Sequence, residues 1–410
     1  MHSRTALDRR RFLASATTAV GVLTLAAVPS AAPALATPVQ GWPDRPFFEF
    51  QLRRLLGEAP LGGADAEEVS AAVRAIGPSP SAEAWVREFS ALGRGLAQRA
   101  ADVAADGRLD ARTIALRAAN YLRTAEFFIS PLGTSLPAKI AMYQEMRQAF
   151  AMAVKGYAVE QVRVPYEGTY LDAYYVHPAN ADGAHPGVVF FGGLDSVGEE
   201  LYLWAGKELA RNGIAVLIVD GPGNGASIRL RGIQSRYDYE VATKAAVDYL
   251  EGRPGIDSDR IGLIGISLGG YYAARSAAFE PRLRATVVWG AIWDESEILT
   301  SGGNLETKRF LAEYGAWVFG GGDFGKAFVD SRRFSMIPVA HLIRNPILII
   351  HGADDVLVPV EQASKLYDAI SAPKLLHIVE SGRPGSAHCQ ADYIPAAWEV
   401  MIPWLLEQLS

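Results

Sequence analysis

The spacing of hydrophobic residues changes once along the chain, at about Glu160. Before this point, from about Phe47 to Tyr157, alanines, leucines and aromatic residues recur three and four positions apart, as in amphipathic helices. The region contains no fixed-period repeat, so the pattern does not support a helical solenoid. Gly and Pro breaks divide it, and the clearest predicted helices are Ala82–Arg99, Ala111–Phe128 and Ala138–Tyr157.

After Glu160, short apolar runs alternate with helical segments, which is typical of a mostly parallel sheet covered by helices on both faces. The first two runs flank Gly168 and predict an antiparallel hairpin. We therefore expect an α/β fold whose function lies at the carboxyl ends of the parallel strands. The predicted strands are Val162–Tyr166, Tyr170–Val176, Val188–Phe191, Ala215–Val219, Ile261–Ile264, Ala285–Val288, Ile347–Ile350 and Leu375–Val379.

The N-terminal stretch has the features of an export signal. Asp8-Arg9-Arg10-Arg11-Phe12-Leu13 resembles a twin-arginine motif, and a weakly apolar run and the small residues Ala34-Leu35-Ala36 follow it. The alternative is a disordered basic tail. We expect residues 1–36 to be a cleaved twin-arginine-type signal peptide, which implies a periplasmic or secreted protein. The apolar run is too short for a stable membrane anchor.

The rest of the chain divides into a helical N-terminal domain over residues 37–160 and an α/β domain over residues 161–410. Half of the residues are hydrophobic and 20% are charged, as in an ordinary globular protein. The net charge of −6 gives no electrostatic reason to expect nucleic acid as a partner. The single cysteine, Cys389, excludes an internal disulfide and a cysteine-based zinc site.

One motif indicates the chemistry. Gly265-Ile266-Ser267-Leu268-Gly269 directly follows a predicted strand and opens a predicted helix, the context in which a nucleophile elbow occurs. A strained turn that exposes a serine leaves no room for side chains two positions before and after it, which explains the glycines. The alternative is a glycine-rich packing turn with a capping serine. We expect Ser267 to be the nucleophile.

A serine nucleophile needs a base, and the base needs a carboxylate that orients it. On such a sheet the order along the chain is serine, acid, histidine. Two histidines follow the last plausible acid: His377 falls inside a predicted strand, where packing explains it, whereas His388 lies in a loop after small residues. We therefore expect His388 to be the base.

The acid is expected to follow the strand Ile347–Ile350, where Asp354 and Asp355 are adjacent. The pattern Gly-x-x-Asp-x-x-Val-Pro selects Asp355, and Asp354 is then expected to cap the turn or face solvent. His351, at the end of the same strand, is expected to bond locally as a structural residue.

An acyl-transfer site also needs hydrogen-bond donors where negative charge develops on oxygen. Gly192-Gly193-Leu194 ends the third strand in a loop whose backbone can approach a ligand closely, so the N–H groups of Leu194 and Leu268 are the predicted oxyanion hole. A plain Gly-Gly turn is the alternative. The glycine-rich stretch Asp220–Gly225 lacks the pattern of a phosphate-binding loop and is expected to be scaffold.

The sequence says less about which residues contact the substrate than about which residues carry out the reaction. Tyr121 and Tyr143 lie on predicted helices and could face a pocket, although aromatic residues at helical spacing usually form core. Glu297 or Glu295 could hold a phenol or keto group, against the alternative of a solvated charge run. Cys389 adjoins His388 in sequence, and we expect its thiol to point away from the imidazole and to pack as a small buried group.

A wider set of motifs carries a family resemblance: Gly192-Gly193-Leu194, Gly265–Tyr271, Glu280-Pro281-Arg282-Leu283, Trp289-Gly290, His388-Cys389 and, in the helical region, Ala118–Phe128. Over residues 160–410 the chain resembles the α/β-hydrolase superfamily. More closely, it resembles the 2,6-dihydroxypseudooxynicotine hydrolase group and its relatives, which include fungal polyketide-shortening hydrolases and fermentation-respiration-switch-type esterases. The likeness extends, less specifically, over residues 45–160.

This resemblance implies a two-domain enzyme with a helical N-terminal cap over the serine, acting often on aryl ketones at a carbon–carbon bond. An exported member makes a carboxylic ester an equally reasonable substrate. We expect an exported serine hydrolase that cleaves an acyl bond of a small aromatic or apolar substrate without a cofactor or metal. The alternatives are a non-catalytic small-molecule-binding protein on the same fold, and a peptidase, which the helical cap makes less suitable.

Overall fold

The structure is a computed structural model in which residues 39–105, 110–179, 183–300 and 304–410 are described. The predicted signal peptide over residues 1–36 lies outside the described residues. Residues Val39–Ser410 form one compact unit.

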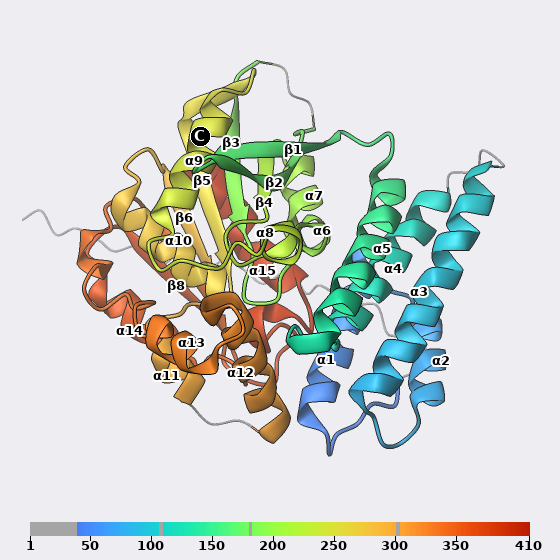
Figure 1. Cartoon of the computed structure of the whole chain (residues 1–410). Coiled ribbons are helices and arrows are strands. Elements are labelled where there is room, and N and C mark those ends of the chain that lie inside the picture. The colour runs from blue at the N-terminus through green and yellow to red at the C-terminus, as the bar shows by residue number, and fades with distance from the viewer. Residues whose placement is uncertain (1–38, 106–109, 180–182, 301–303) are drawn as a thin grey trace, which may run out of the picture. The chain divides into compact units, whose positions relative to one another are not determined.

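The described chain contains an eight-stranded sheet in the order β1-β2-β4-β3-β5-β6-β7-β8 (Figure 1). Strand β2 is antiparallel to both of its neighbours, and the pairs from β4 to β8 are parallel. The predicted hairpin and the mostly parallel sheet are therefore confirmed. The strands are β1 (Val159–Tyr166), β2 (Thr169–Val176), β3 (His185–Phe191), β4 (Ala215–Val219), β5 (Ile256–Ile266), β6 (Ala285–Trp289), β7 (Ile347–Gly352) and β8 (Lys374–Val379).

The sheet has a hydrophobic core on each face, because successive side chains of a strand point to opposite sides. In β3, Val188 and Phe190 belong to one core while Val189 and Phe191 belong to the other, and all four are fully buried. The first core includes residues of α7 (Lys207–Arg211) and α15 (Pro395–Gln408). The second includes residues of α9 (Glu240–Glu251), α10 (Leu268–Phe279) and α14 (Glu361–Ala369).

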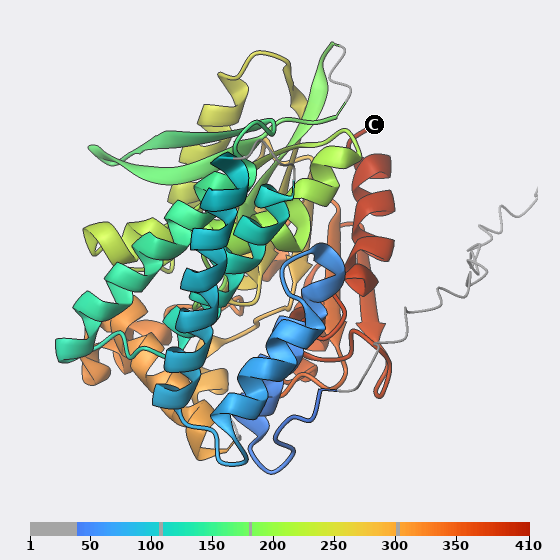
Figure 2. The same ribbon diagram turned by 90° about the vertical axis from the view of Figure 1, so that its right-hand side faces the viewer.

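The N-terminal helices share the first of these cores. Fully buried Trp85 and Phe89 have ring centroids 4.7 Å apart, and they belong to the same apolar cluster as Phe190 of β3. Helix α4 packs against both α3 and α5 (Figures 1 and 2). This region consists of α1 (Pro46–Gly57), α2 (Ala66–Ile76), α3 (Ala82–Ala105), α4 (Ala111–Phe127) and α5 (Leu136–Val154).

Each of the three helices predicted in this region is present, with shifted ends. Helix α5 ends at Val154 instead of Tyr157, because Gly156 adopts a left-handed conformation with φ of 79° that breaks the helix. Strand β1 then begins at Val159, before the predicted boundary. Since residues 39–410 form a single compact unit, the division into two domains stays a prediction.

Three connections contribute further helices near the carboxyl ends of the strands. After β3 come α6 (Gly198–Leu201) and a π-helical segment over Tyr202–Gly206, and α8 (Gly225–Arg231) follows β4. After β6 come α11 (Glu295–Thr300), α12 (Leu305–Gly320) and α13 (Phe324–Ser331), drawn in orange in Figure 1. In the described part of the chain, no helix combines the length and apolarity needed to cross a membrane.

Candidate active site

Ser267 stands at the junction of β5 and α10. Its backbone has φ of 59° and ψ of −123°, a conformation that residues with side chains rarely adopt. The N–H of Ser267 donates to the carbonyl of Trp289 at 2.7 Å, and its carbonyl accepts from Gly270 N at 2.6 Å. These bonds hold the strained turn, as is common where a functional side chain must be exposed.

The two motif glycines allow this turn to be tight. A Cβ atom at Gly265 would lie 1.8 Å from the carbonyl oxygen of Gly269, and one at Gly269 would lie 2.6 Å from the carbonyl oxygen of Gly192. No side chain fits at either distance, so only glycine permits β5, α10 and the loop after β3 to approach each other here. The sharp turn predicted from the motif is therefore present.

The structure brings Ser267, His388 and Asp355 together. His388 Nε2 lies 2.9 Å from Ser267 Oγ, and His388 Nδ1 lies 2.6 Å from Asp355 Oδ2. The other carboxylate oxygen, Oδ1, accepts from the backbone N–H groups of Leu357 and Val358 at 2.9 and 2.8 Å. The carboxylate is thus fixed on one side by the backbone and on the other by the imidazole. This is the arrangement in which a histidine can take a serine proton.

The protonation states of His388 and Asp355 depend on each other. Burial disfavours a charged imidazole, yet the carboxylate of Asp355 raises the pKa of His388 well above its usual value. Burial likewise opposes a charged carboxylate, but the His388 ring lowers the pKa of Asp355. A proton transferred from Ser267 to the ring would consequently be stabilised by a neighbouring negative charge.

Asp354 contacts different residues from those that Asp355 contacts. Its carboxylate accepts from Ser381 Oγ, Gly382 N and Ser386 Oγ at 2.6, 2.8 and 2.8 Å, so it fixes the loop that leads to His388. This local role agrees with the expectation that Asp354 caps a turn.

The other two histidines considered from the sequence make no hydrogen bond to Ser267 or His388 in the described residues, although His351 Nε2 lies 3.4 Å from Asp355 Oδ2. His351 accepts from the N–H of Ala291 at Nδ1, so its Nε2 carries the proton and donates to the carbonyl of Val358 at 2.9 Å. His377 lies on β8, and burial lowers its pKa.

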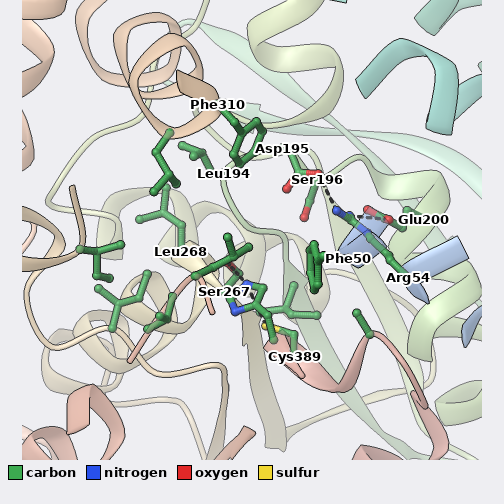
Figure 3. Close-up of a pocket in the computed structure, with 18 of the residues that line it drawn as sticks. Phe50, Arg54, Leu194, Asp195, Ser196, Glu200, Ser267, Leu268, Phe310 and Cys389 are labelled. Atoms are coloured by element: carbon green, nitrogen blue, oxygen red, sulfur yellow. Dashed lines mark hydrogen bonds and ion pairs between the residues drawn. The ribbon is translucent and has the colours of Figure 1, made fainter. Parts of the chain in front are cut away.

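The predicted oxyanion donors lie beside the serine. Leu194 and Leu268 both line the cavity that contains Ser267 (Figure 3), and among the described residues neither backbone N–H makes a hydrogen bond. Gly193 N–H instead donates to Ser196 Oγ at 2.8 Å, and Asn224 Nδ2 donates to the carbonyl of Gly193. The assignment of Leu194 and Leu268 as an oxyanion hole stays a prediction.

The stretch after β4 acts as scaffold for this loop. The Asp220 carboxylate accepts from Gly198 N at 2.9 Å and from Ala226 N at 2.8 Å, so it ties the starts of α6 and α8 together. Its other contact is with Tyr143 of α5, whose hydroxyl donates at 3.1 Å.

The cavity over Ser267 encloses about 730 Å³ between protein atoms, part of it open to solvent. Its walls come from three regions. Helix α1 supplies Phe50, Gln51 and Arg54, α12 supplies Phe310 and Leu311, and the loops, strand end and helix ends at the edge of the sheet supply the rest (Figure 3). The sequence pattern did not single out α1 or α12 as pocket elements. Their apolar residues are spaced like those of any core-facing helix, and the pattern cannot tell which core they face.

Two expected substrate contacts are corrected by the structure. Tyr121 is fully buried within the helical region, where its hydroxyl donates to Glu68 Oε2 at 2.9 Å and accepts from Asp65 N at 2.8 Å. Glu297 accepts from Gln362 Nε2 at 2.6 Å and from Lys365 Nζ at 2.7 Å, and it does not line the cavity. Core packing and a surface ion pair, respectively, account for these residues.

Glu295, the alternative to Glu297, does line the cavity. It is 3% exposed, and its Oε2 has no hydrogen-bond partner among the described residues. Burial, reinforced by the nearby charge of Asp294, raises the pKa of Glu295 to about 8. The side chain is therefore a neutral acid at pH 7, and a neutral carboxyl can donate a hydrogen bond.

The thiol of Cys389 is buried, as expected, but the expectation that it points away from the imidazole is wrong. Cys389 has a left-handed backbone with φ of 50°, which directs Sγ back toward the site, 3.4 Å from His388 Nε2 and 3.6 Å from the carbonyl of Trp289. It lines the cavity, although burial raises the pKa of the thiol and so disfavours a reactive thiolate. The side chains of the adjacent residues His388 and Cys389 were expected to point apart. The left-handed backbone at Cys389 instead brings them together.

The described residues contain no group of three or more His, Cys, Asp or Glu side chains that could hold a metal ion.

Comparison with known proteins identifies the family. The family model described as Esterase FrsA-like matches residues 79–308, which is more than half of the chain. The chain belongs to this family. The match spans helices α4 and α5 as well as the sheet up to β6, so the FrsA-like family includes much of the helical region.

Curated relatives of this FrsA-like chain include fungal hydrolases. The hydrolase acrC of Aspergillus aculeatus is 32% identical over 283 residues, which cover 62% of this chain and 64% of the relative. The α/β hydrolase ucsC of an Acremonium species is 31% identical over 63% of this chain and 58% of the relative. The chain thus spans less than two thirds of the length of these relatives.

Solved structures agree in fold. The crystal structure of 2,6-dihydroxy-pseudo-oxynicotine hydrolase is 27% identical, with a TM-score of 0.69, and the match covers 86% of this chain and 95% of that one. AbyA5 is 19% identical with a TM-score of 0.63, which shows a shared fold alone. Together these matches show that this chain belongs to the Esterase FrsA-like family and has the α/β-hydrolase fold.

Proposed function

We propose that the chain is a serine hydrolase that cleaves an acyl bond, either in a carboxylic ester or between the carbons of an aryl ketone or β-dicarbonyl. The observation that carries this proposal is the continuous pair of hydrogen bonds from Ser267 through His388 to Asp355, at 2.9 and 2.6 Å. It stands at the carboxyl ends of the parallel strands, where α/β enzymes bind their substrates.

The reaction follows from these positions. Ser267 Oγ attacks the acyl carbon while His388 Nε2 takes its proton, and the resulting oxyanion is held by the N–H groups of Leu194 and Leu268. Collapse breaks the acyl bond, and the His388 imidazolium protonates the departing alkoxide, or the departing carbanion stabilised as an enolate or phenol. Water, activated by the same imidazole, then releases the acid and regenerates the serine.

The walls of the cavity suggest the substrate class. Phe50, Phe310 and Leu311 suit an aromatic or apolar group, and neutral Glu295 can donate to a keto or phenolic oxygen. The structural likeness to a hydrolase of an aryl ketone, 2,6-dihydroxy-pseudo-oxynicotine, supports including carbon–carbon bonds among the candidates. No cofactor takes part in this mechanism.

Fluorophosphonate labelling tests the proposal most directly. The purified chain is expected to be labelled at Ser267, and Ser267→Ala is expected to lose labelling and turnover while remaining folded. Cys389→Ala is the matched control, because it removes a thiol that lines the same cavity and is expected to keep labelling. A folded protein that resists labelling and hydrolyses nothing would favour the non-catalytic binding protein.

A screen of aryl esters against aryl 1,3-diketones, with products identified by mass spectrometry, then decides which bond is cleaved. Detection of a free alcohol or phenol with an acid indicates an ester, whereas a ketone with an acid indicates a carbon–carbon bond.

Export through a twin-arginine pathway is a second part of the proposal and rests on Arg9-Arg10 and the residues after them. Fusing residues 1–40 to a reporter that is active only after folded export tests it. Arg9→Lys with Arg10→Lys is expected to abolish export, and unchanged export would refute a twin-arginine route.

A further inference from the structure

We infer that the N-terminal helices position the proposed oxyanion hole, through two arginines that hold Asp195. The inference rests on the proposed function, since it assigns these helices a part in the chemistry besides covering the site. We call Gly192–Ser196 the oxyanion loop. It carries Leu194, whose N–H is the predicted donor, and Asp195 follows directly.

The carboxylate of Asp195 is held from two helices. Arg54 Nη1 of α1 lies 2.9 Å from Asp195 Oδ2, and Arg123 Nη2 of α4 lies 2.7 Å from the same oxygen (Figure 3 shows the contact of Arg54). The side chains of Asp195, Arg54 and Arg123 are only 15%, 10% and 6% exposed, respectively. Buried ion pairs of this kind are worth little as stability but strongly fix geometry, because separating the partners leaves a charge unpaired.

A second carboxylate contacts the same two arginines. Glu200 of α6 accepts from Arg54 Nη2 at 2.6 Å and lies 3.0 Å from Arg123 Nη2. Each arginine therefore contacts both Asp195 and Glu200, so neither can turn away without breaking two contacts. Although burial opposes the charged form, Arg54 and Arg123 lower the pKa of Asp195, which keeps the carboxylate ionised and the group paired.

The rest of the oxyanion loop is held from the α/β side at different points. Asn224 holds the carbonyl of Gly193, and Ser196 Oγ accepts from the N–H of Gly193. These bonds fix the loop before Leu194. After Leu194, Arg229 Nη2 of α8 donates to the carbonyl of Asp195 at 3.5 Å and Gly225 N donates to the carbonyl of Ser196 at 3.2 Å, while the hydrogen bonds to the side chain of Asp195 come from α1 and α4. The donor at Leu194 thus adjoins the residue whose carboxylate the N-terminal helices hold.

The position of this donor matters for rate. An oxyanion donor must lie about 2.7–3.1 Å from the developing charge, and displacing a catalytic group by about 1 Å can cost about 100-fold. A loop that begins with two glycines has little stiffness of its own. Arg123 does not line the cavity, so it is a positioning residue that acts through Asp195.

The test compares two arginines of the same helix. Arg123→Gln and Arg117→Gln are made in the full chain and assayed with p-nitrophenyl acetate, which is too small to reach the distal walls of the cavity. Arg117 is a suitable control because it forms a two-bond pair with Glu68, at 3.0 and 3.1 Å, within the helical region. We expect Arg123→Gln to lower kcat about 10- to 100-fold with KM changed less than about threefold, and Arg117→Gln to keep kcat within about twofold.

Asp195→Asn weakens the same ion pair from its other partner, and it tests the inference if Arg123→Gln does not fold. It retains the shape of the side chain and is expected to lower kcat by a similar factor. In the double variant the loss is expected to be no greater than in the larger single one, because both substitutions remove one interaction. Arg123→Lys retains the positive charge but lacks the planar array of N–H donors of a guanidinium group. It is therefore expected to recover only part of kcat.

The outcomes separate this inference from the proposed function. If the wild-type chain neither hydrolyses the ester nor reacts with a fluorophosphonate, the proposed function fails. If the wild-type chain is active and folded Arg123→Gln and Asp195→Asn hydrolyse the ester at the wild-type kcat, the inference fails while the proposed function stands.

Discussion

The backbone of Gly193 lies directly against the side chain of Ser267. A methyl group on Gly193 would be 2.7 Å from Ser267 Cβ and 3.1 Å from Ser267 Oγ. The first distance is shorter than packed atoms allow, and the second would place carbon where the hydroxyl must turn to attack. The smallest possible residue is therefore required beside the proposed nucleophile, independently of any need for unusual backbone angles.

Gly193→Ala is accordingly expected to lower kcat about 100-fold, because either the serine or the oxyanion loop must move by several tenths of an ångström. Steady-state hydrolysis of a small activated ester measures this. Gly95→Ala is the control: Gly95 lies in α3 with no atom within 4 Å of an added Cβ, and it is expected to keep full activity and gain about 0.5–1 kcal/mol in stability. Equal activity of the two variants would show that the oxyanion loop is not so close to the reacting atoms.

Asp355→Asn is expected to reduce kcat by about 10⁴, because an amide favours the wrong imidazole tautomer; this magnitude is the known value for the equivalent change in a serine protease. Asp354→Asn removes a carboxylate that contacts only the loop Ser381–Ser386 in the described residues and is expected to cost far less. Steady-state kinetics of both variants on one ester decide between the neighbours. A larger loss for Asp354→Asn would contradict the assignment of the acid.

The pH profile gives a second readout of the same pair. The base must be neutral to accept a proton, so kcat/KM of the wild-type chain is expected to rise with pH through the raised pKa of His388, above the usual 6.5. In Asp355→Asn the negative charge is gone, and the rise is expected at lower pH. A rise at unchanged pH would mean that Asp355 does not control the proton affinity of His388.

The parts that could be predicted from the sequence are those defined by local pattern. The Gly-x-Ser-x-Gly motif after a strand specified the turn at Ser267, and the order of elements brought Asp355 and His388 to the same edge of the sheet. Both depend on chain order and strand periodicity alone. The oxyanion loop was also recognisable, because it ends a buried strand with two glycines.

The contacts that could not be predicted join segments far apart in the chain. The bond of Arg54 to Asp195 spans 141 residues, and that of Arg123 spans 72, and no local pattern distinguishes these arginines from the others. The expectation that Tyr121 contacts the substrate failed for a related reason, because periodicity says that a residue is buried without saying which core or cavity it meets.

Glu295 is expected to make binding of a keto or phenolic substrate depend on pH. Its carboxyl is protonated below its pKa of about 8 and can donate to the substrate, but it loses that proton and repels an oxygen acceptor above this pH. KM is therefore expected to rise above pH 8 in the wild-type chain and to stay flat in Glu295→Gln, whose amide donates at every pH. Glu297→Gln is the control, since Glu297 pairs with Lys365, and it is expected to retain the wild-type profile. Identical profiles for all three proteins would exclude Glu295 from substrate binding.

The last prediction concerns the aromatic walls of the cavity. Phe50 of α1 is 8% exposed, and its ring centroid lies 6.5 Å from that of His388, so it covers the reacting group from the helical side. Phe310 of α12 faces the same cavity, and its ring packs 5.0 Å from Phe127. Truncating either residue removes apolar area that a bulky substrate would cover, and burying one such side chain is worth about 1.5–3 kcal/mol.

Phe50→Ala and Phe310→Ala are thus each expected to lower kcat/KM for a naphthyl ester about 10- to 100-fold while leaving that for an acetate ester within about threefold. Phe328→Ala is the matched control, because Phe328 of α13 is 51% exposed and lies outside the cavity. Parallel losses on both esters would mean that these phenylalanines support the fold of the site and do not select the substrate. Unchanged kinetics on both would mean that the substrate binds elsewhere along the sheet edge, away from α1 and α12.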